Sequence, residues 1–233
     1  MNKICINSDV HKLIIVYEDD SVVVVNKPKN MLTHHTKYDT DNTVVDYLIH
    51  KVNVDEFEDK SRPGIVQRLD RNTTGLMVVA KNIEAYNSLI NQISNNTLTK
   101  KYLTIVHGKF KKDSLIIKCP IIRSKKNTTK MVVSDDPKAK DATTIIKVLK
   151  ESNELSLIEC TLVTGRTHQI RVHMNFIHHN VLNDPLYGHE DGYKDYDQFL
   201  HSYHLSFYHP ITKELLEFKS VPDNTFNSVI KYE

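Results

Sequence analysis

The chain has 233 residues, which is long enough to bury a hydrophobic core in one large domain or two small ones. Hydrophobic residues make up 39% and charged residues 26%, and Gly and Pro are few, which excludes collagen-like, low-complexity and disordered chains. The net charge is only +2, yet residues 99–150 carry 14 basic and 4 acidic side chains, a net charge of +10. Such clustering is typical of a surface that binds a phosphate backbone, although a solvated lysine-rich face has a similar composition.

No window approaches the roughly 18 consecutive apolar residues that a membrane helix requires. Residues 1–20 match neither a secretory signal nor a transit peptide, so we expect a cytoplasmic protein without a membrane segment. The cysteines, Cys5, Cys119 and Cys160, are far apart and form no CxxC pair. We therefore expect reduced thiols, and neither a disulfide framework nor a cysteine-based zinc site.

The first part of the chain predicts a hairpin, a loop and a helix. Two β-branched runs within 13–26 flank a polar turn at 18–21, which is typical of a hairpin. Lys27-Pro28 ends the second strand, because proline cannot continue a central ladder. A helix is predicted from Thr43, with Asn42 or Thr43 as its cap. Its expected apolar face consists of Val44, Tyr47, Leu48 and Val52.

Residues 54–63 are charged and lack apolar periodicity, which predicts an exposed loop. Residues 65–70 should be extended, and the apolar run 76–80 should be a buried central strand. Asn82 is the expected cap of a second helix, which the pair Asn95-Asn96 ends. Its apolar stripe consists of Tyr86, Leu89, Ile90 and Ile93.

The rest of the chain predicts mostly strands, with one helix beginning at Thr167 and a hairpin near the end around Pro210. The apolar face of that helix should hold Ile170, Met174 and Ile177. About ten strands, mostly consecutive, against three substantial helices indicate a mixed α+β fold around a mainly antiparallel sheet.

Two stretches carry chemistry. In GIVQRLDRNTTG (64–75), Asp70 lies between Arg68 and Arg71 after an extended run and before a turn. A carboxylate flanked by guanidinium groups stays ionised and suits a nucleophile, although an Asx-turn aspartate beside surface arginines has the same pattern.

In TGRTHQIRVHM (164–174), Arg166 and Arg171 lie at a predicted strand-to-helix junction. Guanidinium donors beside a helix N-terminus are suited to binding an anion or a phosphate group.

Other chemistries are excluded by their missing motifs, since the sequence has no GxxxxGK[ST], GxGxxG, GxSxG, HExxH or PCxxC. The region 168–209 is rich in histidine, but the spacing matches no standard set of metal ligands. We expect hydrogen-bonded histidines and no metal there. The histidines in question are His168, His173, His178, His179, His189, His201, His204 and His209.

Together the two stretches closely resemble the signature blocks HRLDxxTSG and GRTHQIRxH of the RluA-type RNA pseudouridine synthases. Lys27-Pro28, Lys101-Tyr102, NDPLYG (183–188) and LHSYHLSFYHP (200–210) resemble further blocks of that family, in the family's order. The resemblance covers about residues 13–219. It implies the pseudouridine synthase catalytic fold, with a bent central sheet and flanking helices, over 1–233 as a single domain without an N-terminal S4 module.

The resemblance also implies roles for individual residues. Asp70 matches the aspartate that attacks the target uridine, Tyr102 the tyrosine stacked on its base, and Arg171 the arginine that pairs with the aspartate. Arg68 matches the side chain that fills the gap left by the flipped base. Because the isomerisation needs no redox change and no outside reagent, no cofactor is expected.

The expected partner is RNA, ribosomal or transfer, and the protein is expected to be a monomer. We expect RNA to be bound by Arg68, Arg71, Arg166, Lys100 and Lys101. The lysine-rich region that follows should supply affinity for the RNA backbone and should not read bases.

Three positions depart from the family pattern: Gln67 stands where His is usual, Thr74 where Ser is usual and Asn30 where Gly is usual. None of these changes removes a reacting group, although they affect the expected geometry around Asp70. Two alternatives stay open, a non-catalytic RNA-binding or RNA-folding protein on the same fold and a metal-dependent hydrolase that uses the C-terminal histidines.

Overall fold

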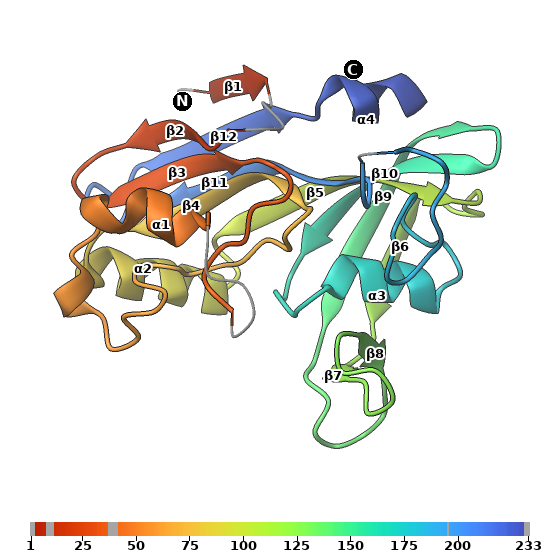
Figure 1. Cartoon of the computed structure of the whole chain (residues 1–233), viewed down its shortest axis with the longest axis horizontal. Helices are drawn as coiled ribbons and strands as arrows, with labels where there is room; N and C mark the ends of the chain where they lie inside the picture. Colours follow the sequence, from red (N-terminus) through yellow and green to blue (C-terminus); the bar gives the residue numbers. More distant parts are fainter. Residues whose placement is uncertain (1–2, 8–11, 37–41, 195, 231–233) are drawn as a thin grey trace. The chain divides into compact units, whose positions relative to one another are not determined.

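The computed structural model describes residues 3–7, 12–36, 42–194 and 196–230 (Figure 1). The chain divides into two compact units, one formed by residues up to 100 together with 202–223, the other by residues 101–201 together with those from 224 on. The predicted mixed α+β fold with a mainly antiparallel sheet is confirmed. That 1–233 acts as one catalytic domain stays a prediction.

The first unit contains the two predicted hairpins, one near each end of the chain, together with β1 and β4. They follow the order β2-β3-β4-β11, and β12 pairs with β11 on one side and with β1 on the other. The pairing of β1 with β12 is parallel, while β2–β3, β3–β4 and β11–β12 are antiparallel. Their bounds are β1 (Lys3–Asn7), β2 (Ile14–Glu18), β3 (Val22–Lys27), β4 (Thr74–Ala80), β11 (Leu200–Tyr208) and β12 (Leu215–Val221).

Helix α2 (Ile83–Ser94) covers the core of this unit. Every residue of β3 and β4 is buried, and side chains of both strands form one cluster with Ala85 and Leu89 of α2. The predicted cap is present, since the side chain of Asn82 accepts a hydrogen bond from the Ala85 N–H at 2.9 Å.

Helix α1 (Val44–Leu48) begins with a capping box, in which Thr43 and Asp46 bond each other's backbone N–H groups. Its predicted apolar face is correct for Val44 and Leu48, but Tyr47 is 52% exposed. The helix is only five residues long and continues as a 3-10 turn, Ile49–Lys51. Tyr47 therefore does not share the buried face of Val44, although it follows that residue by three positions.

The prediction of an exposed loop over 54–63 is wrong in part. The segment begins with a 3-10 turn, Val54–Glu56, and Phe57 is buried with its ring edge-on to Tyr86 of α2. The carboxylate of Glu56 accepts a hydrogen bond from the Ile83 N–H, which satisfies a free donor at the start of α2. The sequence did not predict this burial, because Phe57 stands alone among charged residues and forms no periodic apolar pattern.

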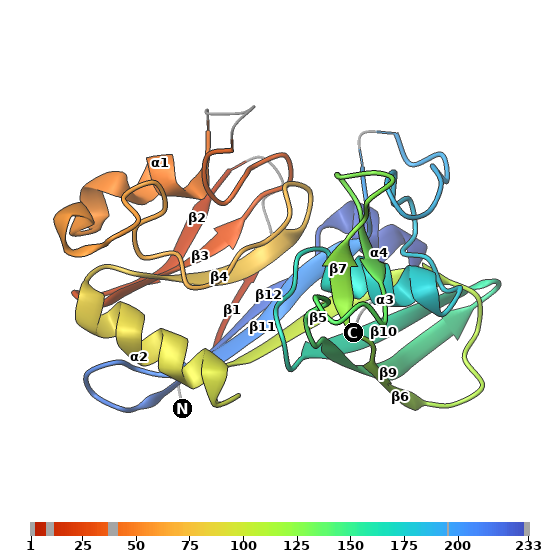
Figure 2. The same cartoon turned by 90° about the horizontal axis from the view of Figure 1, so that it is seen from below.

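The second unit is built on four antiparallel strands in the order β5-β10-β9-β6. A separate hairpin, β7–β8, lies beside helix α3 (Figure 2). The bounds are β5 (Thr99–His107), β6 (Ser114–Lys118), β7 (Ile121–Arg123), β8 (Met131–Val133), β9 (Thr143–Ser152), β10 (Leu155–Leu162), α3 (Gln169–Phe176) and α4 (Asn224–Val229). The elements that the sequence did not predict are β1, β7 and α4.

Helix α3 begins at Gln169, two residues later than predicted, because His168 adopts a left-handed conformation with φ +56°. Ile170 and Met174 are buried as expected, whereas Ile177 lies just beyond the last turn and is half-buried.

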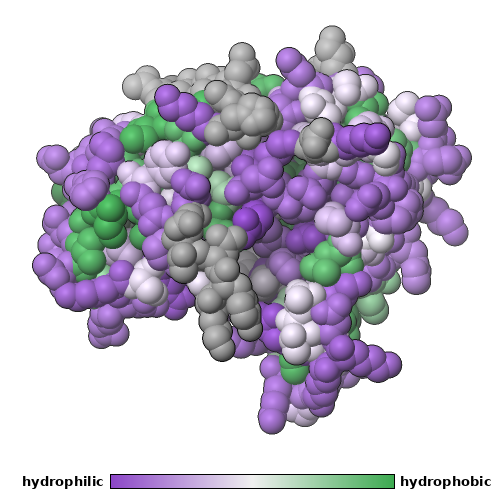
Figure 3. Space-filling model, viewed as in Figure 1, coloured by the Kyte–Doolittle hydropathy of each residue, from purple (hydrophilic) through white to green (hydrophobic). Residues whose placement is uncertain are grey.

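Most basic side chains of residues 99–150 are exposed, and hydrophilic residues cover much of the face of the molecule that Figure 3 shows. The exposed basic side chains of this region are Lys109, Lys111, Lys112, Lys118, Arg123, Lys125, Lys126, Lys138, Lys140, Lys147 and Lys150. Within the part of the chain that the structure describes, no helix has the length and apolar character to cross a membrane.

Candidate active site

Asp70 lies at the turn that leads into β4. The preceding segment runs beside that strand, since the Ala80 N–H donates to the Gly64 carbonyl at 2.9 Å and the Thr73 N–H closes the turn onto the Asp70 carbonyl at 3.1 Å. Gly75 follows with φ +109°, and a Cβ there would lie 2.2 Å from the carbonyl oxygen of Ser202 in β11. Only glycine allows this approach, so the position of the turn relative to β11 is fixed.

Thr33 holds the residue before Asp70. Its hydroxyl donates to the Leu69 carbonyl at 3.0 Å and accepts from the Leu69 N–H at 3.2 Å. Thr33 and Leu69 are both buried, whereas Asp70 is half-buried. The peptide in front of the candidate nucleophile is therefore fixed, while Asp70 itself is only half-buried.

Lys27, the last residue of β3, holds the residue after Asp70. Its ammonium group donates 2.8 Å hydrogen bonds to three carbonyls, those of Pro28, Met31 and Arg71. The side chain is fully buried, and this burial lowers the pKa of Lys27 to about 7, while the negative charge of Asp70 acts in the opposite direction. Lys27 thus connects the 28–31 loop to the Asp70 turn and places a cation near its carboxylate.

The other polar side chains of this turn differ in exposure. Arg68 and Arg71 are exposed, as the prediction of RNA contacts requires. Burial, and then the positive charges of Arg68 and Arg62, lower the pKa of His34, which places this imidazole near Arg68. Both amide atoms of Gln67 are buried without a hydrogen-bond partner among the described residues, an arrangement that costs about 1–3 kcal/mol and is uncommon away from functional sites.

In the second unit, Tyr102 lies in β5 opposite Cys160 of β10 and is 6% exposed. Its neighbour Lys101 forms an ion pair with Glu159 at 3.2 Å. Lys100 is also 6% exposed, and burial lowers its pKa. This burial does not favour the predicted contact between Lys100 and RNA phosphates, because such a contact requires an accessible ammonium group.

Arg171 of α3 forms a bidentate pair with Asp184. Its Nε and Nη2 atoms each donate to a different oxygen of the carboxylate at 2.7 Å, and both side chains are buried. Burial raises the pKa of Asp184, but the hydrogen bond and charge of Arg171, together with the N–H groups of Tyr187 and Leu186, outweigh it and lower this pKa. The guanidinium group also lies over the Tyr187 ring, 5.1 Å from its centroid.

Gln169 fixes the loop that carries Arg166. The amide oxygen of Gln169 accepts from the Arg166 N–H and the Thr164 hydroxyl, and its NH₂ group donates to the Thr143 carbonyl and the Thr144 hydroxyl. Arg166 is exposed and donates through Nε to the Asp141 carbonyl at 2.9 Å.

Sequence reasoning did not find Thr33 or the full environment of Lys27, and it assigned no role to Asp184. The NDPLYG block contained the only signal for Asp184, which lies 13 residues after Arg171. His173 has a structural role, because its ring bonds the Thr144 hydroxyl and the Cys119 carbonyl at 2.9 and 3.0 Å and is fully buried.

Comparison with known proteins identifies the family. A family model described as RNA pseudouridylate synthase matches residues 21–176, which include the Asp70 turn, Tyr102 and Arg171. The chain belongs to this family. The predicted resemblance to the RluA type is thereby confirmed, and the chain is an isomerase of the RNA pseudouridine synthase class.

Relatives of known name agree. The chain is 43% identical over 207 residues to a protein of Bacillus subtilis (strain 168) named uncharacterized RNA pseudouridine synthase YlyB, covering 88% of this chain and 68% of that protein. It is 38% identical over 214 residues to ribosomal large subunit pseudouridine synthase D of Zymomonas mobilis, covering 88% and 67%. Among solved structures, human RNA pseudouridylate synthase domain containing 1 matches with a TM-score of 0.73 at 26% identity over 95% of this chain and 88% of that one.

Proposed function

We propose that this pseudouridine synthase isomerises specific uridines in structured RNA in the cytoplasm, by flipping the base and using Asp70 as the nucleophile. Ribosomal RNA is the favoured substrate, because the relative of Zymomonas mobilis is named for the large ribosomal subunit. Transfer RNA is the alternative. We expect the protein to act as a monomer without a cofactor.

The observation that carries the proposal is the double restraint on Asp70. Thr33 holds Leu69 on one side, Lys27 holds Arg71 on the other, and Asp70 between them is half-buried. A nucleophile must be fixed within a fraction of an ångström of its productive position, and a surface Asx-turn aspartate needs no such support.

The carboxylate either adds to the uracil ring, after which the C1′–N1 bond breaks, or displaces the uracil from C1′ of the ribose. The ring then turns and C5 bonds to C1′. The bond to Asp70 is released, the proton at C5 is lost, and N1 gains a proton. In this proposal Tyr102 stacks on the flipped ring, and its hydroxyl or a water removes the C5 proton. The family resemblance assigns Arg171 the role of partner to this aspartate, and Asp184 holds the plane of its guanidinium group. Arg68 occupies the space that the base leaves, which offsets part of the few kcal/mol that flipping costs.

The exposed basic side chains of 99–150 then bind the RNA backbone, together with Arg71, Arg166 and Lys101. Exposed lysines supply affinity that falls steeply with salt, whereas sequence choice requires contacts to bases. Because Lys100 is buried, we expect it to contribute least to RNA affinity among the predicted basic residues.

The experiment is to map pseudouridines. Total RNA from cells lacking the gene is incubated with the protein or with Asp70→Asn, and carbodiimide-dependent primer-extension stops are recorded on ribosomal and transfer RNA. The proposal expects new stops with the unaltered protein and none with the variant. Stops on transfer RNA alone would overturn the ribosomal substrate, and identical stops with both proteins would overturn the role of Asp70.

A further inference from the structure

Two histidines and an aspartate converge in the second unit, outside the residues assigned to the reaction. His107 is the last residue of β5, while His189 and Asp191 lie in the segment between α3 and β11. The Nε2 atom of His107 lies 3.1 Å from Oδ2 of Asp191, and Nε2 of His189 lies 3.0 Å from Oδ1. One ligand atom from each of the three residues lies within 4.8 Å of the other two.

The aspartate is held in place before any ligand arrives. The Asn183 N–H donates to Oδ2 of Asp191 at 2.6 Å, and the Asp191 N–H donates to the side-chain oxygen of Asn183 at 2.6 Å. The backbone of His107 is fixed as well, since its N–H donates to the Asn180 carbonyl and its carbonyl bonds Nδ1 of His179. Fixed ligands lower the entropy lost when an ion binds.

The spacing of these atoms suits a tetrahedral metal ion. With bonds of about 2.0–2.1 Å, neighbouring ligand atoms in a zinc site lie about 3.3 Å apart. Each imidazole nitrogen lies within a few tenths of an ångström of that distance from one carboxylate oxygen, His107 at 3.1 Å from Oδ2 and His189 at 3.0 Å from Oδ1 of Asp191. Imidazole nitrogen with one carboxylate is a ligand set typical of zinc, whereas magnesium and calcium prefer oxygen alone.

The cluster is also accessible. The side chain of His189 is 66% exposed and that of His107 is 29% exposed, whereas Asp191 is 13% exposed. An ion can therefore enter from solvent on the side of His189, and a water molecule can complete the coordination.

We propose that His107, His189 and Asp191 bind one zinc ion through two imidazole nitrogens and the carboxylate of Asp191, with water completing the coordination. The ion joins the segment 183–191 to the end of β5. That segment also carries Asp184, the partner of Arg171, so the bound ion stabilises the support of this arginine. For His189, the expectation that the histidines of 168–209 hold no metal is replaced by this proposal, which does not depend on the proposed RNA substrate.

The test uses the full chain without a histidine tag, freed of metal with a chelator and titrated with ZnCl₂ in a calorimeter. We expect one Zn²⁺ per chain and a higher melting temperature with zinc. His189→Ala should weaken binding at least tenfold, since even the loss of outer partners typically costs about 10–100-fold. Because His189 is largely exposed, this variant should keep its fold, which far-UV circular dichroism verifies.

The matched control is His35→Ala, which removes an imidazole 2.7 Å from Asp46, in a pair that no third ligand group joins among the described residues. This control should bind zinc as tightly as the unaltered protein, and Asp191→Asn should bind it as weakly as His189→Ala. Absence of binding at millimolar ZnCl₂, or equal binding by the unaltered protein and His189→Ala, would overturn the site. Tighter binding of MgCl₂ than of ZnCl₂ would overturn the proposed ion.

Discussion

The ammonium of Lys27 donates a 2.8 Å hydrogen bond to the carbonyl of Arg71, the residue that follows Asp70. This contact joins the end of β3 to the turn before β4, across 44 residues of sequence. It also explains why a lysine is buried here, since three carbonyls accept from it and Asp70 supplies a nearby negative charge.

Lys27 should make stability depend on pH in the alkaline range. Its pKa in the folded chain, about 7, is below its ordinary value of 10.5, so between these values the unfolded chain binds more protons. The free energy of unfolding should therefore rise between pH 7 and pH 10, by an amount on the order of a few kcal/mol. Urea titrations across this range should show the rise in the unaltered protein and a clearly smaller rise in Lys27→Met, in which the lowered pKa of Lys100 still contributes.

Asp184→Asn should destabilise the second unit by about 3–5 kcal/mol, because it leaves the buried guanidinium of Arg171 without its counter-charge. Urea titration at pH 7 measures this change. The control is Asp55→Asn, since the ion pair of Asp55 with Lys60 is exposed and should contribute nothing measurable. A loss of stability no larger than that of the control would contradict the importance of the buried pair.

Gln67→Leu should separate stability from activity. The substitution removes two buried polar atoms that have no partner among the described residues, so the free energy of unfolding should stay equal or rise by about 1–3 kcal/mol. If the amide contacts the substrate, kcat/KM should fall about tenfold or more, as expected for one lost hydrogen bond of about 1.4 kcal/mol.

The matched control for this variant is Gln169→Leu, in which the lost amide makes four hydrogen bonds. Gln169→Leu should lower the free energy of unfolding by several kcal/mol. A drop of similar size in Gln67→Leu would show that Gln67 supports the fold and has no role toward substrate.

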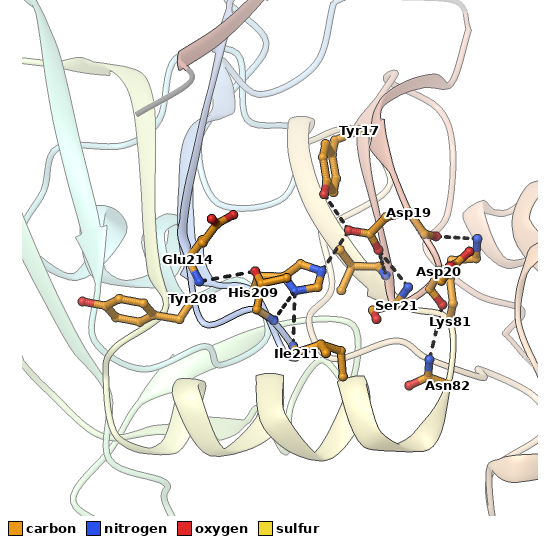
Figure 4. A network of polar contacts seen from close by, with 12 residues as sticks. Tyr17, Asp19, Asp20, Ser21, Lys81, Asn82, Tyr208, His209, Ile211 and Glu214 are labelled. Carbon is orange, nitrogen blue, oxygen red and sulfur yellow. Dashed lines mark hydrogen bonds and ion pairs between the residues drawn. The ribbon is translucent and has the colours of Figure 1, made fainter.

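Asp19 organises a polar network in the first unit (Figure 4). Its carboxylate accepts from the Tyr17 hydroxyl at 2.6 Å and from the Ser21 and Val22 N–H groups at 2.8 Å, and it lies 2.8 Å from Nε2 of His209. Burial raises the pKa of Asp19, but these hydrogen bonds outweigh it and lower this pKa below its ordinary value of 3.8.

The lowered pKa of Asp19 gives stability that is complete above the unfolded value and is lost as pH falls through the folded value. Acid titration of unfolding should show this loss below about pH 4. Asp19→Asn should lower the free energy of unfolding at pH 7 by about 1–3 kcal/mol and reduce that acid dependence. If the free energy of unfolding of Asp19→Asn fell with acid as steeply as that of the unaltered protein, carboxylates other than Asp19 would be responsible for the loss.

The sequence predicted those elements whose signals are local. The β-branched runs gave β2 and β3, and the helix caps Thr43 and Asn82 lie where residue preference places them. The order of residues around Asp70 and Arg171 was enough to indicate the family, and the family model confirms that identification.

Features that depend on distant contacts were missed. Glu56 bonds the start of α2 from 27 residues away, and Asp184 is recognisable as a partner only when α3 places Arg171 against it. The cluster of His107 with Asp191 joins residues 84 positions apart, so no motif of ligand spacing reveals it. Tyr47 was misplaced because a five-residue helix presents too short a face for periodicity to decide burial.

Single-turnover kinetics on the RNA identified by mapping test most directly whether Asp70 is the nucleophile. Release of tritium from C5-labelled uridine should be lost in Asp70→Asn by a factor on the order of 10⁴ or more. Asp59→Asn, an exposed aspartate of the same unit, should keep the rate of the unaltered protein. A rate for Asp70→Asn within tenfold of that control would contradict the account.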